Sequence, residues 1–163
     1  MKRLLWYGVV CAFVATGMTF SGAQDRSANE GIRGQLVGAW RLARLEQPGP
    51  DGKIHNADST GLLVFTRDGH MSVQVMYRNP PANSQPNPQN AAPVQYAQAG
   101  YEASFGTYKI DESAHIFTFH VEGALVRSLI GKDLKREYEL SGKQLIVKPA
   151  SPDEHWRVAW EHY

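Results

Sequence analysis

Residues 61–77 read GLLVFTRDGHMSVQVMY, two apolar runs on either side of a short polar turn. The first run is rich in β-branched and aromatic residues, and in the second, which begins at Met71, apolar and polar residues largely alternate. Such alternation is typical of a strand with one buried face. Asp68-Gly69 tolerates the positive φ angles of a tight hairpin turn. This stretch therefore predicts two antiparallel strands.

Short strands are predicted on both sides of this hairpin. The first covers residues 36–46, but its pattern is mixed: one face carries Trp40, Leu42 and Arg44, and the other carries Arg41, Ala43 and Leu45. Toward the C-terminus, turn residues at hairpin spacing separate strands predicted over 104–110, 115–122, 134–140, 144–148 and 156–162. About eight short strands of this kind are typical of an all-β sandwich or an antiparallel up-and-down barrel.

Two segments have a different composition. Residues 78–93, RNPPANSQPNPQNAAP, contain five prolines and many Asn and Gln residues, so they predict a long exposed loop. Such a loop is either a lid or binding loop, or a tolerated surface insertion. Residues 94–103 combine spaced apolar residues with good helix formers, which predicts one short helix.

The N-terminus has the pattern of an export signal. Lys2 and Arg3 precede an apolar stretch, and the small residues Ser21-Gly22-Ala23 stand before polar Gln24. We therefore expect a signal peptide over 1–23, a flexible lead-in over 24–34, a single domain over 35–163, and a periplasmic or secreted protein. The alternative is an uncleaved membrane anchor, because the apolar stretch is just long enough to span a bilayer. Cleavage would also remove Cys11, the only cysteine.

Composition and motifs exclude several classes of function. The formal net charge is +1, and no cluster of basic residues interleaves with aromatic ones, so nucleic acid is not an expected partner. The six histidines are scattered without the spacing of metal ligands. No phosphate-binding or dinucleotide-binding motif occurs. We expect neither a metal nor a cofactor, and no membrane contact after signal cleavage.

Several segments resemble the bacterial and fungal lipocalin-like domain family. They include LVGAWRL at 36–42, residues 61–74, SFGTY at 104–108, HVEG at 120–123 and REYEL at 136–140, and the resemblance extends to Trp160-Glu161. It implies a closed antiparallel barrel with a central cavity, a lipocalin-like β-barrel. It implies little about chemistry, since the function of such domains is largely unassigned.

Polar residues that share a face with apolar ones are the candidates for a site. In 134–140, one face carries Leu134, Arg136, Tyr138 and Leu140, and the other is charged. Arg136 is thus expected to point inward, where a buried charge needs a partner. That partner is either an anionic group of a ligand or an internal ion pair or plug that closes the barrel end against Trp40. The residues expected to border a ligand are Trp40, Met71, Val73, Tyr101, Tyr108, Arg136 and Tyr138.

His120 is the candidate acid–base residue. If the polar face of 115–122 lines the barrel, Thr118, His120 and Glu122 lie together, and Glu122 holds the His120 tautomer. If the Phe117 and Phe119 face lies inside, which the alternation favours, His120 faces solvent and this role fails.

The leading hypothesis is an exported barrel that binds a small, partly apolar molecule. The alternatives are a small-molecule isomerase or cyclase that uses His120, and a filled barrel that acts as a structural or interaction module. The sequence leaves open whether catalysis occurs, which ligand binds and what the oligomeric state is.

Overall fold

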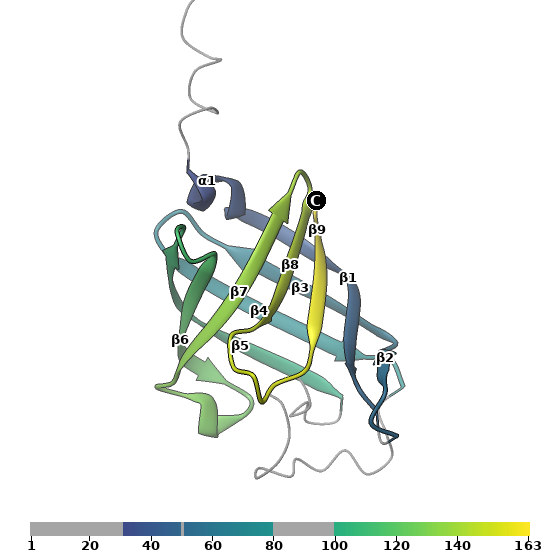
Figure 1. The fold of residues 1–163 in the computed structure, drawn as a ribbon. Coiled ribbons are helices and arrows are strands. Elements are labelled where there is room, and N and C mark those ends of the chain that lie inside the picture. The colour runs from purple at the N-terminus through teal and green to yellow at the C-terminus, as the bar shows by residue number, and fades with distance from the viewer. Residues whose placement is uncertain (1–30, 50, 80–99) are drawn as a thin grey trace, which may run out of the picture.

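The fold is a closed antiparallel barrel (Figure 1). The computed structural model describes residues 31–49, 51–79 and 100–163. The predicted signal peptide, most of the predicted lead-in and nearly all of the 78–93 loop lie outside these residues. The elements in chain order are α1 (Ile32–Leu36), β1 (Gly38–Pro48), β2 (Ile54–Asn56), β3 (Ser59–Phe65), β4 (His70–Tyr77), β5 (Tyr101–Asp111), β6 (Ile116–Ala124), the 3-10 turn η2 (Arg127–Leu129), β7 (Asp133–Ser141), β8 (Gln144–Pro149) and β9 (Arg157–His162).

Each strand from β3 to β9 pairs with the next one along the chain, and β1 closes the barrel by pairing with both β3 and β9. Strand β2 is an extra strand that pairs only with the end of β1 among the described residues. The predicted antiparallel barrel is therefore confirmed, as eight strands with one short addition.

The predicted hairpin is present as β3 and β4. Phe65 lies opposite Met71 in the register, and the turn between them contains Gly69 with φ of 97°, a conformation that favours glycine. The Thr66 N–H donates to the His70 carbonyl at 2.9 Å, and the Thr66 hydroxyl oxygen accepts from the His70 N–H at 3.0 Å. These bonds fix the register, which directs Met71, Val73 and Val75 to the same face.

A β-bulge explains the mixed pattern of the first strand. The register of β1 against β9 shifts between Leu42 and Arg44. A bulge adds one residue to one strand and so changes which face the following side chains occupy. Trp40 and Leu45, which simple alternation places on opposite faces, are therefore both buried, at 1% and 0% exposure.

The short helices differ from the predicted ones. Residues 101–103, the end of the predicted helix over 94–103, belong to β5, Gly100 lies in a turn, and residues 94–99 lie outside the described residues. A helix is present instead at Ile32–Leu36, where the sequence predicted the end of a flexible lead-in. The connection between β6 and β7 contains the single turn η2.

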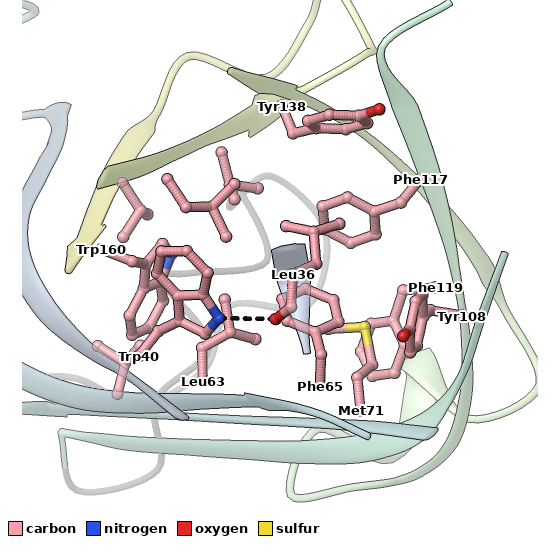
Figure 2. Packing of buried hydrophobic residues seen from close by; sticks show 14 of the residues in the cluster. Leu36, Trp40, Leu63, Phe65, Met71, Tyr108, Phe117, Phe119, Tyr138 and Trp160 are labelled. Carbon is pink, nitrogen blue, oxygen red and sulfur yellow. Dashed lines mark hydrogen bonds between the residues drawn. The ribbon is translucent and has the colours of Figure 1, made fainter. Parts of the chain in front are cut away.

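Aromatic packing fills the half of the barrel next to α1, which lies at one end of the barrel (Figure 1). The buried Leu36 carbonyl accepts a 2.8 Å hydrogen bond from the Trp40 indole, drawn as the dashed line in Figure 2. Phe65 meets both Tyr108 and Phe117 edge to face, with ring centroids 5.0 and 5.7 Å apart. The interior is therefore closed at this end by side chains.

Candidate functional site

A cavity of about 80 Å³ lies inside the barrel, and we call it the barrel cavity. Its wall is formed mostly by apolar side chains from strands around the barrel: Leu63, Met71, Val73, Val75, Phe117, Phe119, Leu129, Leu134, Val147, Trp156, Val158 and Trp160. The polar residues of the wall are Glu102, Ser104 and Arg136.

The charged groups lie toward the barrel end opposite α1. Glu102 is the second residue of β5, and Arg136 pairs with Pro149, the last residue of β8. Trp156 directly precedes β9. These strand ends and the turn η2 are at the far end of the barrel from α1 (Figure 1). The cavity is therefore apolar in its depth and charged near this end.

Arg136 points inward, as the alternation of 134–140 predicted, and is only 7% exposed. Its Nη1 lies 3.6 Å from a Glu154 carboxylate oxygen and donates to the Lys135 carbonyl at 3.0 Å. The guanidinium carbon is 5.0 Å from the centre of the Trp156 ring, and the Trp156 indole donates to the other Glu154 oxygen at 3.0 Å. Of the two alternatives, the structure contains the internal ion pair, with Glu154 and not Trp40 beside the arginine.

Burial and charge act in opposite directions on Arg136. Burial lowers the pKa of the guanidinium, and the nearby carboxylates of Glu154 and Glu102 raise it. Because the ordinary value for arginine is above 12, Arg136 stays charged at neutral pH. The cation is thus held in place by a carboxylate and a stacked ring within the protein itself.

Glu102 is a wall residue that the sequence reasoning missed. Burial raises the pKa of its carboxyl to about 7, and the positive charge of Arg136 only partly opposes this effect. Among the described residues, none donates a hydrogen bond to this carboxyl. Strand β5 brings Glu102 inward because Ser104, Gly106 and Tyr108 also face the interior. The same alternation, extended backward from Tyr108, indicates an inward Glu102, but the helix-forming residues of 94–103 conceal this signal.

The structure brings three of the seven predicted ligand-bordering residues together at the cavity: Met71, Val73 and Arg136. The other four border no part of it. Trp40 belongs to the filled half beside α1.

The three tyrosines lie elsewhere for different reasons. Tyr108 is buried, and its hydroxyl donates to the Thr66 carbonyl at 2.9 Å, so it ties the β3–β4 turn to β5. Tyr138 is buried near Phe117, with ring centroids 6.5 Å apart (Figure 2). Tyr101 is exposed, and its hydroxyl donates to Gln74 at 3.3 Å. It precedes the inward-facing Glu102 and therefore faces outward.

His120 and Glu122 are exposed on the outer face of β6, because Phe117, Phe119 and Val121 occupy its inner face. His120 Nδ1 lies 2.7 Å from an oxygen of Asp133, which is also exposed. This placement corrects the interpretation in which His120 and Glu122 line the cavity, and an acid–base role there is not open to them.

Two further observations concern the described residues alone. No group of three or more His, Cys, Asp or Glu side chains among them is arranged to hold a metal ion. None of the helices formed by these residues is long and apolar enough to cross a membrane.

Comparison with solved structures gives neighbours with low sequence identity. An uncharacterised protein from Bacteroides eggerthii is 16% identical, with a TM-score of 0.44, and the match covers 78% of this chain and 99% of that one. A lipocalin-like protein from Bacteroides uniformis is 15% identical, with a TM-score of 0.45 and coverage of 78% and 98%. A mutant of the fluorescent protein UnaG is 12% identical, with a TM-score of 0.38 and coverage of 80% and 97%. None of these likenesses carries a functional argument.

Sequence comparison identifies the family directly. No curated protein matches the chain. A lipocalin-like domain matches residues 37–161, which span the barrel from the start of β1 to β9. The chain therefore belongs to the lipocalin-like domain family.

Proposed function

We propose that this protein binds a small, partly apolar molecule in the barrel cavity. The observation that carries the proposal is the composition of the wall, where twelve apolar side chains enclose a space that also contains Glu102 and Arg136. Binding sites for small molecules are mostly apolar, with a few polar groups that fix the orientation of the ligand. Transfer of apolar ligand surface from water to such a wall is favourable by roughly 25 cal/mol per Å².

The volume limits the size of the ligand. The cavity measures about 80 Å³, whereas sites for drug-sized ligands measure roughly 300 to 1,000 Å³. A molecule that is fully enclosed is therefore no larger than about one ring or a short chain. A larger ligand would insert only one apolar arm.

The test combines a filling variant with a matched control. Val73→Phe places a larger side chain into the cavity, and Gln74→Phe adds a ring at the next position, outside the cavity wall. Two wall residues, Trp156 and Trp160, provide an intrinsic fluorescence signal for titration with a neutral probe such as phenethyl alcohol. We expect saturable binding that Val73→Phe abolishes and Gln74→Phe retains. No binding to the wild-type protein, or equal binding to both variants, would contradict the proposal.

We also propose that the protein acts in the periplasm or outside the cell. The support is the pattern of residues 1–23, with a basic start, an apolar stretch and small residues before Gln24. Expression of the full chain in a Gram-negative host, followed by mass spectrometry of the intact periplasmic protein, tests this directly. A mature chain that begins at Gln24 supports export with cleavage, and an intact N-terminus retained in the membrane fraction contradicts it.

A further inference from the structure

We propose that the ligand carries a protonated amine, which binds to the Glu102 carboxylate at the charged end of the barrel cavity. This inference rests on the proposed function and adds the chemical class of the ligand. It reverses the simplest interpretation of an inward arginine, in which Arg136 binds an anion.

The Arg136 charge is already matched inside the protein. Glu154 lies 3.6 Å from the guanidinium, and Trp156 both stacks on the arginine and donates to Glu154. An anionic ligand would have to displace or compete with this carboxylate. It would also meet a second carboxyl, Glu102, on the same wall. The arrangement therefore disfavours an anion.

The charged groups at this end of the cavity are unequal in number. Glu102 comes from β5, Arg136 from β7 and Glu154 from the connection between β8 and β9, so two carboxyl groups face one cation. Among the residues that the structure describes, Tyr77 of β4 is a further titratable group on which the charge of Glu102 acts. Burial raises its pKa, so it stays neutral, and its hydroxyl donates to Gln47 at 3.0 Å. When Glu102 is ionised, this end of the cavity lacks one positive charge.

Glu102 also lacks a donor of its own. Glu102 is half-buried, none of the described residues donates a hydrogen bond to its carboxyl, and removing a carboxylate from water is costly unless it is paired. Its raised pKa, about 7, reflects this environment. A ligand ammonium would supply both the charge and the N–H donors, and its apolar portion would contact Phe117, Phe119 and Trp160 deeper in the cavity.

Three probes of the same shape and different charge provide the test: phenethylamine, phenethyl alcohol and phenylacetate. Titrations monitored by tryptophan fluorescence at about pH 8, where Glu102 is ionised and the amine is protonated, measure each Kd. We expect the amine to bind at least about tenfold more tightly than the alcohol, and phenylacetate to bind weakest. At about pH 5 the amine should lose this advantage because Glu102 takes up a proton.

The variants separate the two proposals. Glu102→Gln should reduce the ratio of the alcohol Kd to the amine Kd to about one, whereas Glu122→Gln, at an outward carboxyl, should leave both affinities and their ratio at the wild-type values. If the alcohol binds but the amine does not bind more tightly, or if Glu102→Gln keeps the preference, the inference is wrong and the proposed function stands. If none of the three probes binds, both are wrong.

Discussion

Replacing Glu102 with glutamine should remove a fall in stability that the wild-type protein undergoes as the pH rises. Burial raises the pKa of this carboxyl from 4.5 to about 7. Between these two values the folded chain holds a proton that the unfolded chain has released. The free energy of unfolding therefore decreases as the pH rises through this range, and it stays low above the folded-state pKa.

The size of the effect follows from the same pKa values. Each unit of pKa difference between the folded and unfolded states corresponds to about 1.4 kcal/mol. The free energy of unfolding therefore falls by about 3 kcal/mol in total. Glutamine is close in shape and carries no charge at any pH. At about pH 8 the Glu102→Gln variant should therefore be more stable than the wild type by up to about 3 kcal/mol, and near pH 4 the two should be nearly equal.

Urea denaturation of both proteins at a series of pH values between about 5 and 8 measures this difference. Asp51, Asp68 and Asp111 have pKa values lowered mainly by hydrogen bonds from neighbouring side chains, so the stability that they add changes only below about pH 5. Their contributions are shared by the two proteins and cancel in the difference. A difference that stays constant across this range would refute the reasoning, because it would show that Glu102 titrates normally in the folded state.

Three further predictions concern packing and charge. Tyr138→Phe should leave the protein unchanged or raise its stability by about 1 kcal/mol, because the buried hydroxyl has no hydrogen-bond partner among the described residues; a clear fall in Tm would contradict this. Gly106→Ala should lower stability by about 3 kcal/mol or more, since its Cβ would lie 2.0 Å from the His120 carbonyl oxygen; a soluble variant with an unchanged denaturation midpoint would overturn this expectation. Arg136→Met should destabilise the fold by up to about 3 kcal/mol, because Glu154 loses its cation and keeps only the Trp156 indole as a partner, and the double variant with Glu154→Leu should recover most of that loss; equal stability of the single and double variants would show that the two residues are not coupled.

The barrel could be predicted from local patterns because most strands follow simple alternation. The hairpin of β3 and β4 and the inward face of β7 were both evident from period-two spacing, and so was the inward position of Arg136. The first strand could not be read in this way. Its bulge changes the face between Leu42 and Arg44, and nothing in the local sequence marks the position of the extra residue.

The site was less predictable because its partners come from separate strands. The inward arginine was evident from β7 alone, but its partner Glu154 lies in the connection between β8 and β9, where no periodic pattern applies. Glu102 lies at the start of a strand that helix-forming neighbours concealed. Trp40 and Tyr108 were expected to border a ligand; both are buried, but only the fold determines which part of the interior each of them occupies.

The two halves of the barrel interior differ in a way that stability alone does not explain. The half beside α1 is filled by aromatic and aliphatic side chains, which is the arrangement that stabilises a small barrel most directly. The other half contains a buried ion pair, although replacing such a pair with apolar residues is often neutral or stabilising. Because Glu154 and Trp156 already hold Arg136, the arginine fixes the geometry of the wall, and Glu102 is the charged wall residue left to interact with a ligand. Under the proposed function, the charges at this end select the ligands by charge, and the apolar depth limits the size of the group that enters.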